Sequence, residues 1–169
     1  MVITNETEMP YMRPPLSKEL WLSGTSNDNF KFKQWNGAER SLFYEPDDFY
    51  TDPSKLPEEP NGGVCIVRGY AVDKLDIYNK TAILTDGTEI KYGECLVATG
   101  SEPKNLSIFK AASQVIKNKV SLFKNIEDFK KLKKTMEKVK SVAIIGGGFL
   151  GSELSCALSK YGEYQNNTE

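Results

Sequence analysis

The sequence predicts an α/β fold, and three observations support that prediction. An apolar stretch, Val142–Ile145, leads into a glycine-rich turn that is followed by a helical pattern. Apolar residues recur at three- and four-residue steps over 126–139, which is the spacing of an amphipathic helix. The runs Ala82–Thr85 and Glu89–Tyr92 flank Asp86-Gly87, and both of these turn residues tolerate the positive φ of a tight hairpin.

Composition limits the classes of protein to consider. The chain has 169 residues, of which 39% are hydrophobic, so it holds enough apolar material for a packed core. Its 22 basic and 23 acidic residues give a formal charge of -1, which excludes binding of polyanions through overall charge. The sequence contains no histidine. His-based catalytic triads, His-ligated zinc and histidine general bases are therefore excluded within this chain.

The cysteines and the apolar runs limit redox chemistry and membrane insertion. Cys65, Cys95 and Cys156 are far apart and have neither C-x-x-C nor zinc spacing. We therefore expect reduced cysteines, buried as small hydrophobic residues. No apolar run reaches the roughly 20 residues of a membrane-spanning helix, and the acidic start of the chain resembles neither a secretory signal nor a transit peptide. We expect neither a membrane span nor a targeting segment in this chain.

The first part of the chain predicts short elements separated by rigid or polar segments. Residues 1–4 predict a strand. Residues 10–22 contain three prolines and predict a rigid extended turn, after which Ser17 caps a short helical turn. Residues 23–29 are polar and predict a loop.

The remaining elements follow the same α/β pattern. Val64–Val67 and Cys95–Ala98 are short apolar runs that predict strands. Asn125 is the predicted N-cap of the helix over 126–139. Ser152–Tyr161 predicts a second helix, which we expect to end at Gly162 ahead of a polar tail.

The densest chemical signal is Gly146-x-Gly148-x-x-Gly151, placed between a predicted strand and a predicted helix. In that context the glycines permit a tight turn, a close approach of a pyrophosphate and close helix–strand packing. The helix N-terminus favours the phosphate charge. The pattern therefore predicts dinucleotide binding, and the alternative is a glycine turn needed only for packing. The acidic residue that would hold the ribose is expected roughly 20 residues further on, so we expect half of the site in this chain.

A basic segment supports a rival interpretation. Residues 117–140 contain nine lysines and only three acidic residues. Such a segment can bind nucleic acid through phosphates without sequence preference. The alternative is a solvated helix face whose apolar side packs on the core. The lysines are Lys117, Lys119, Lys124, Lys130, Lys131, Lys133, Lys134, Lys138 and Lys140.

Four segments together closely resemble the apoptosis-inducing-factor family, mitochondrial flavoproteins of the pyridine nucleotide-disulphide oxidoreductase group. The similarity runs from about residue 2 to residue 161, and the first two segments are long and unusual, which makes the match specific to this family. The segments are Met9–Trp21, Phe32–Gly37, Leu96–Gly100 and Ile144–Leu154.

The resemblance implies a fragment of the two-Rossmann-domain FAD/NAD(P)-binding fold of flavoprotein disulfide reductases. Residues 1–100 would be a partial FAD-binding domain. Residues 101–169 would be a partial NAD-binding domain that ends after its first strand-turn-helix. The family's first glycine motif would lie before residue 1, and other parts of both domains would lie after residue 169. We therefore expect an incomplete form that by itself binds FAD weakly or not at all.

The resemblance also assigns residues to the flavin. Arg13 and Lys18 match positions that contact FAD, and Val72 matches a backbone contact beside the flavin. Lys18 and Glu153 would form the catalytic pair at the reactive edge of the isoalloxazine; without the resemblance they would be ordinary surface charges. Lys124 stands where the family usually has an arginine that contacts FAD, and a lysine keeps the charge but loses the planar fork.

Further cofactor contacts are implied at both ends of the chain. Asn5 stands where the family usually has a glutamate that holds the adenosine ribose, and Glu6 beside it could substitute. Trp35 matches an aromatic residue that stacks on the nicotinamide; the alternative is a core or hairpin aromatic. The implied NAD-binding turn consists of Gly146, Gly147, Gly148, Phe149, Leu150 and Gly151.

The implied activity is hydride transfer from NADH to FAD, with electrons passing on to a quinone, oxygen or another acceptor. The segment Arg13–Lys18 lacks the redox-active cysteine pair of disulfide reductases, so we do not expect thiol–disulfide exchange. The resemblance places the protein in the mitochondrial intermembrane space, and in the nucleus on release during programmed cell death. It leaves open a protein partner or dimer of the full-length form. The alternative function is a non-catalytic truncated form that binds DNA or a protein through the 117–140 helix.

Overall fold

The computed structural model describes residues 1–22 and 30–166, and the predicted loop at 23–29 lies outside them. The chain forms two compact units. Unit 1 consists of Met1–Tyr11 and Phe43–Thr99, and unit 2 consists of Met12–Leu42 and Gly100–Glu169. Both units are thus assembled from segments that are distant in sequence.

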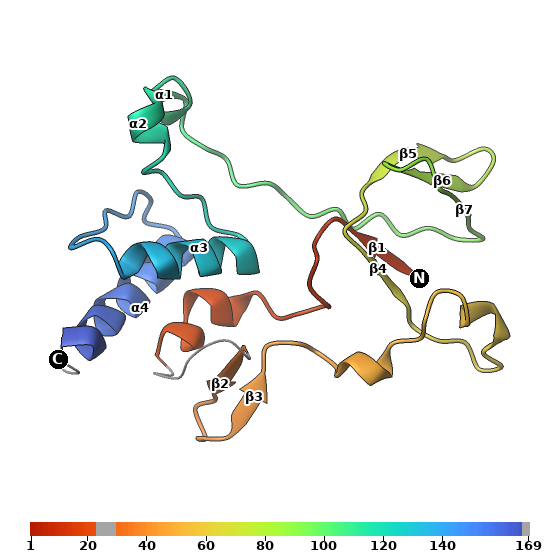
Figure 1. Ribbon diagram of the computed structural model, residues 1–169, viewed down its shortest axis with the longest axis horizontal. Helices are drawn as coiled ribbons and strands as arrows, with labels where there is room; N and C mark the ends of the chain where they lie inside the picture. The colour runs from red at the N-terminus through yellow and green to blue at the C-terminus, as the bar shows by residue number, and fades with distance from the viewer. Residues whose placement is uncertain (23–29, 167–169) are drawn as a thin grey trace. The chain divides into compact units, whose positions relative to one another are not determined.

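Unit 1 is built from short strands. Three of them, β5, β6 and β7, are yellow-green in Figure 1. The first strand, β1 (Val2–Thr4), pairs in parallel with β4 (Ile66–Arg68), with Val2 opposite Ile66. The antiparallel sheet has the order β5-β6-β7, and the predicted Asp86-Gly87 turn joins its last two strands, with φ 86° at Gly87. The remaining elements of unit 1 are β5 (Val72–Asp76), β6 (Thr81–Leu84), β7 (Glu89–Lys91), η4 (Asp47–Phe49) and η5 (Leu56–Glu58).

In the residues that the structure describes, unit 2 combines two 3₁₀ helices, a small hairpin and four α-helices. The 3₁₀ helices η1 and η2 follow each other directly within the proline-rich segment, and Pro14 occupies the first position of η1, where its fixed φ suits a helix start. The elements are η1 (Pro14–Ser17), η2 (Glu19–Trp21), β2 (Lys31–Lys33), β3 (Glu39–Ser41), α1 (Ser107–Lys110), α2 (Gln114–Lys117), α3 (Ile126–Met136) and α4 (Phe149–Asn166).

Trp21 is the centre of the core of unit 2. Its side chain is 2% exposed, and its ring meets Phe129 of α3 and Tyr161 of α4 edge-on, with centroids 4.9 Å and 5.4 Å away. Its indole N–H donates a hydrogen bond to the carbonyl oxygen of Leu16, 2.7 Å away. One side chain therefore joins η1, η2, α3 and α4.

The sequence prediction for α3 is confirmed, including its cap. The Asn125 side chain accepts a hydrogen bond from the Asp128 N–H, and the Asp128 carboxylate accepts one from the Asn125 N–H, which completes a capping box. Ile126, Phe129 and Leu132 are buried on one face. The helix ends at Met136 rather than at residue 139, where the side chain of Val139 is already exposed.

Two predicted strands are wrong. Cys95–Ala98 and Val142–Ile145 have no regular secondary structure and belong to none of the sheets formed by the described residues. Leu96 is 90% exposed and Ile145 67% exposed. A strand requires a neighbour that completes its backbone hydrogen bonds. The described part of the chain supplies no such neighbour to either segment, so apolar composition alone does not produce a strand there.

The predicted ends of α4 are also wrong. The helix begins at Phe149 and continues through Gly162 to Asn166. Glycine inside a helix costs only about 1 kcal/mol, which burial of Leu154, Ala157 and Leu158 along α4 outweighs. Ser17 does not cap a helix; it is the last residue of η1.

The cysteines only partly follow the prediction. All three are free, as expected. Cys65 is buried, but Cys95 and Cys156 are exposed, because the first lies at the unpaired 95–98 segment and the second on the solvent side of α4. Among the described residues, none of the helices is both long and apolar enough to cross a bilayer.

Replacing Trp21 by alanine is expected to lower the free energy of unfolding by about 3–5 kcal/mol, because it removes a large buried ring. The other tryptophan, Trp35, is 98% exposed, so Trp35→Ala is a matched control that should change the free energy by less than about 0.5 kcal/mol. Urea denaturation followed by far-UV circular dichroism measures both. Equal losses in the two variants would contradict the central role of Trp21.

Candidate functional site

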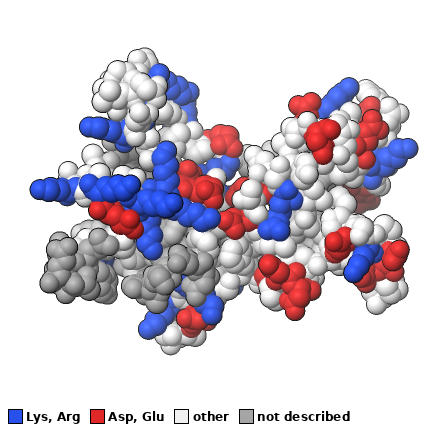
Figure 2. Space-filling model, in the orientation of Figure 1, with Lys and Arg blue, Asp and Glu red and all other residues white. Residues whose placement is uncertain are grey.

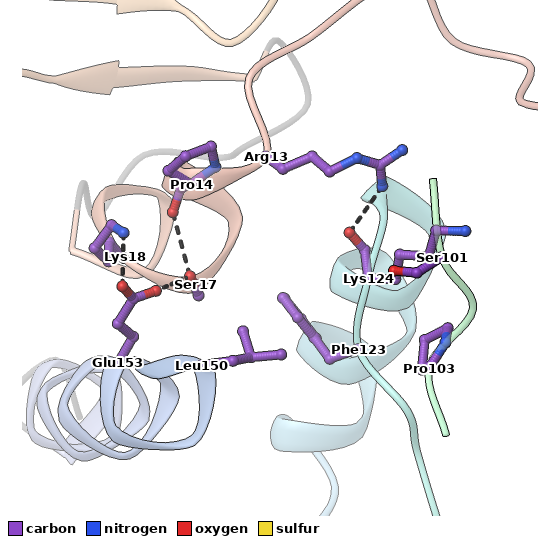
Figure 3. A pocket seen from close by; sticks show the side chains of 10 residues that line it. All are labelled: Arg13, Pro14, Ser17, Lys18, Ser101, Pro103, Phe123, Lys124, Leu150 and Glu153. Atoms are coloured by element: carbon purple, nitrogen blue, oxygen red, sulfur yellow. Dashed lines mark hydrogen bonds and ion pairs between the residues drawn. The ribbon is translucent and has the colours of Figure 1, made fainter. Parts of the chain in front are cut away.

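An open pocket of about 460 Å³ lies within unit 2, and Figure 3 shows the side chains that line it. The side chains come from η1 and its flanks, from the segments before α1 and α3, and from the first turns of α4. The lining residues are Arg13, Pro14, Ser17, Lys18, Ser101, Pro103, Phe123, Lys124, Leu150 and Glu153. Four residues that sequence analysis assigned to cofactor contacts are thereby brought together with Glu153, the predicted catalytic partner of Lys18; the four are Arg13, Lys18, Lys124 and Leu150.

An ion pair lies at one end of this pocket. The Lys18 ammonium is 2.9 Å from Oε1 of Glu153, and the Ser17 hydroxyl donates to Oε2 of the same carboxylate at 2.6 Å. Lys18 joins the two 3₁₀ helices and has φ -134° and ψ -98°, which is outside helical geometry. Because the backbone changes direction at Lys18, consecutive residues 17 and 18 both reach one carboxylate on α4 (Figure 3).

Glu153 is held in its ionised form. The hydrogen bond from Ser17 is the largest cause that lowers the pKa of Glu153, followed by the hydrogen bond and the positive charge of Lys18. Desolvation acts in the opposite direction; it is smaller than either hydrogen bond and larger than the effect of the Lys18 charge. The side chains of Lys18 and Glu153 remain 39% and 32% exposed, so solvent screens their attraction.

The other end of the pocket is cationic. The Arg13 guanidinium donates to the carbonyl oxygen of Lys124 at 3.0 Å, which ties the proline-rich segment to the residues before α3. The Lys124 ammonium lies 2.7 Å from the carboxylate of Glu102, and the Lys124 N–H donates to Asp128 in the first turn of α3. The position of Lys124 is therefore set by the cap of α3.

The glycine turn has two positions that require glycine. Gly146 has φ 125°, a conformation that residues with a side chain rarely adopt. A Cβ at Gly151 would collide with the carbonyl oxygen of Gly146. Gly148 has open space around it, and its carbonyl oxygen accepts the Ser152 N–H at the start of α4. The close approach predicted for the third glycine is thus present, although no strand precedes the turn.

The remaining predicted residues do not line the pocket. Trp35 lies at the turn between β2 and β3 and is almost fully exposed, which excludes the core alternative. Asn5, Glu6 and Val72 belong to unit 1. The Glu6 carboxylate accepts a hydrogen bond from the Tyr11 hydroxyl, and Val72 begins β5 with an exposed side chain. The cofactor roles of these residues stay predictions.

Sequence analysis missed several residues of the pocket. Ser17 was assigned to a cap, although its position next to Lys18 was a signal that both could reach one partner. Glu102, which pairs with Lys124 but does not line the pocket, lies 22 residues before it, and no spacing rule connects such a pair. Pro14, Phe123 and Pro103 form apolar parts of the wall, which no local pattern distinguishes from other loop residues.

Comparison with known proteins identifies the class. Residues 1–166 match the family of pyridine nucleotide-disulphide oxidoreductases. The chain belongs to this family.

The relatives narrow the resemblance further. The chain is 45% identical to putative apoptosis-inducing factor 1, mitochondrial, of Drosophila melanogaster, over 98% of this chain and 23% of the relative. It is 36% identical to apoptosis-inducing factor 1, mitochondrial, of Dictyostelium discoideum, over 94% of this chain and 28% of the relative. The resemblance to apoptosis-inducing factors is therefore confirmed. The chain spans about a quarter of the length of these relatives.

Solved structures agree on the fold. NADH:rubredoxin oxidoreductase from Clostridium acetobutylicum superposes with a TM-score of 0.69 and 25% identity, over 95% of this chain and 35% of that chain. A ferredoxin reductase from Rhodopseudomonas palustris gives a TM-score of 0.68 at 24% identity, over 92% and 32%. The predicted fold class is confirmed: the chain comprises about a third of the FAD/NAD-binding fold of these reductases.

Replacing Glu153 by glutamine is expected to lower the free energy of unfolding at pH 7 by about 0.2–1 kcal/mol, as is usual for a partly exposed pair. Because the pKa of Glu153 is lowered from 4.5, its carboxylate stabilises the fold above that value. The contribution is lost as the pH falls through the lower, folded-state pKa. Urea denaturation of both proteins at pH 7 and pH 3 should show the difference shrinking at acid pH.

Glu127→Gln serves as the control for this prediction. Glu127 pairs with Lys130 on the exposed side of α3, at 3.1 Å. Its substitution should change the stability less than that of Glu153. A Glu153→Gln effect of the same size at both pH values would contradict the assignment of an ionised, hydrogen-bonded carboxylate.

Replacing Gly151 by alanine is expected to destabilise the chain by about 1–3 kcal/mol, because the added methyl group collides with backbone that cannot move away cheaply. The control lies on the same helix. Gly162 has nothing within 4 Å of its Cβ position, so Gly162→Ala should stabilise by about 0.5–1 kcal/mol. Thermal unfolding of both variants measures the contrast, and destabilisation by both would contradict it.

Proposed function

We propose that the chain contributes to the flavin and NADH sites of an FAD-dependent NADH oxidoreductase of the apoptosis-inducing-factor type. The observation that carries this proposal is the Lys18–Glu153 ion pair at the pocket of unit 2. Membership of the pyridine nucleotide-disulphide oxidoreductase family indicates the class of reaction. The ion pair adds a charged group with a defined position at the pocket.

The composition of the pocket fits an anionic, aromatic cofactor. Three cations, Arg13, Lys18 and Lys124, line it, against the single carboxylate of Glu153. Phe123 and Leu150 contribute apolar wall, together with prolines. Cationic groups suit a pyrophosphate, and apolar walls suit a flat ring. FAD combines both features in one molecule.

Within that site the proposed roles follow from charge. FAD, when bound, supplies the acceptance of a hydride from NADH. The Lys18 ammonium stabilises negative charge that develops beside it. Glu153 holds the ammonium in place and balances its charge. Arg13 and Lys124 hold the anionic part of the cofactor.

The glycine turn is the proposed binding site for NADH. Gly146, Gly148 and Gly151 bend the backbone, and the N-terminus of α4 favours a pyrophosphate. Gly147, Phe149 and Leu150 complete the turn. Trp35 has both ring faces accessible and is the proposed stacking partner of the nicotinamide.

Further assignments extend this proposal to the whole protein. Asn5, Glu6 and Val72 are proposed to contact FAD from unit 1. The proposed domains are a partial FAD-binding domain over 1–100 and a partial NAD-binding domain over 101–169. Among the relatives are a rubredoxin-NAD(+) reductase of Pseudomonas putida and the mitochondrial apoptosis-inducing factors. By analogy we propose a mitochondrial oxidoreductase with a role in programmed cell death, which passes electrons to a separate acceptor.

The basic 117–140 segment does not favour a second function. Figure 2 shows lysine and arginine side chains gathered over α3. The same helix buries Ile126, Phe129 and Leu132, so its lysines occupy the face that any amphipathic surface helix leaves to solvent. Binding of DNA through this segment stays a prediction from the sequence.

The test is FAD binding by charge-matched variants. We expect Lys18→Gln to weaken FAD binding by about tenfold, because it removes a cation from the pocket and leaves the Glu153 carboxylate without the positive charge of Lys18. Lys110→Gln removes the same charge from the exposed end of α1, away from the pocket lining, and should leave FAD affinity unchanged. Flavin fluorescence gives the affinity, and bleaching of bound flavin by NADH gives the reaction. Equal weakening of FAD binding in the two variants, or no weakening by Lys18→Gln, would contradict the proposal.

A further inference from the structure

We propose that Ser17 is a positioning residue for the Lys18–Glu153 pair: its hydroxyl orients the Glu153 carboxylate, which in turn holds the Lys18 ammonium at the pocket. The role of this arrangement in placing a cation beside FAD rests on the proposed function. The arrangement itself concerns only residues of this chain.

Ser17 is the rigid member of the three residues. Its side chain is 3% exposed, whereas Lys18 and Glu153 are both partly exposed. Its backbone follows two prolines with fixed φ, and the turn is held by a hydrogen bond from the Lys18 N–H to Pro15. The Trp21 indole anchors the preceding Leu16 carbonyl in the core. A short side chain on such a backbone has little freedom, so its hydroxyl can set the position of a longer partner.

The two carboxylate oxygens of Glu153 have separate donors. Lys18 binds Oε1 and Ser17 binds Oε2. Two donors on two oxygens fix the rotation of the carboxylate about its last bond. With the Ser17 donor removed, a single flexible lysine would remain, and neither long side chain would hold the other in one orientation.

The single proton of Ser17 makes this arrangement sensitive to the charge of Glu153. Its oxygen lies 2.6 Å from Oε2 of Glu153 and 3.3 Å from the carbonyl oxygen of Pro14. A hydroxyl donates only one hydrogen bond, and donation to an ionised carboxylate is the stronger choice. When Glu153 is protonated, the same proton is available to Pro14. The Ser17 hydroxyl therefore favours the ionised form of Glu153.

Other charged groups line the pocket with Glu153, but Lys18 is the one whose positive charge lowers the pKa of Glu153. Arg13 from the start of η1 and Lys124 from the segment before α3 line the pocket and are cations, as is Lys18. Glu19, which follows Lys18 in the sequence and begins η2, does not line the pocket. The effect of Ser17 must therefore be separated from this cationic background by a variant that changes no charge.

The experiment follows the titration of Glu153 by carbon-13 NMR in the 169-residue chain without cofactor, with the resonance assigned by Glu153→Gln. We expect Ser17→Ala to move the pKa of Glu153 up, toward that of a free glutamate, and Ser17→Thr to restore it because it restores a hydroxyl. Ser155→Ala, an exposed serine two residues along α4, should leave it unchanged. An unchanged pKa in Ser17→Ala, or no recovery in Ser17→Thr, overturns the proposal.

A second measurement needs no variant of Ser17 and decides the case if Ser17→Ala does not fold. In the parent chain, the Cβ resonance of Ser17 should shift with the same midpoint as the Glu153 carboxylate, because the hydroxyl changes its acceptor when Glu153 is protonated. A Ser17 resonance that does not follow Glu153 overturns the proposal. Both measurements are made without FAD or NADH, so failure of the proposed function in the Lys18→Gln test leaves their outcome untouched.

Discussion

The packing of Trp21 is the contact on which the site depends. Lys18 and Glu153 are 135 residues apart in sequence, and their elements meet because the Trp21 ring packs against Phe129 on α3 and Tyr161 on α4. The indole also hydrogen-bonds to Leu16, inside the turn that carries Ser17 and Lys18. Hydrophobic burial, which is not directional, supplies the association energy, and the hydrogen bond fixes the orientation.

Electrostatics acts on this scaffold as a positioning force rather than as a source of stability. The Lys18–Glu153 pair is too exposed to contribute much to folding. Its value lies in placing a cation at a pocket that already carries Arg13 and Lys124. In such a site, the free energy of binding an anionic ligand depends on where each cation is held. A buried hydroxyl that positions the ion pair therefore affects this binding more than another surface charge would.

Local sequence rules succeeded where the interactions that define an element are local. The Asn125 cap, the hairpin turn at Asp86-Gly87 and the requirement for glycine at Gly146 each depend on residues within four positions of one another. They failed for Cys95–Ala98 and Val142–Ile145, because a strand exists only with a hydrogen-bonded neighbour, and that neighbour is not encoded in the segment itself. The extension of α4 through Gly162 likewise reflects burial of Leu154, Ala157 and Leu158, which depends on neighbours distant in sequence.

The sequence by itself determined the class of protein, through long unusual segments and the glycine motif, and it named Lys18 and Glu153 as a pair through family resemblance. Only the tertiary structure decided that Arg13, Lys124 and Leu150 line the same pocket and that Trp35 is exposed. It also showed that the Ser17 hydroxyl donates a hydrogen bond to Glu153 of the ion pair and does not cap a helix. The physical reason is one of range. Backbone conformation is set by neighbours along the chain, whereas a site is made by side chains whose meeting depends on packing between elements far apart in sequence.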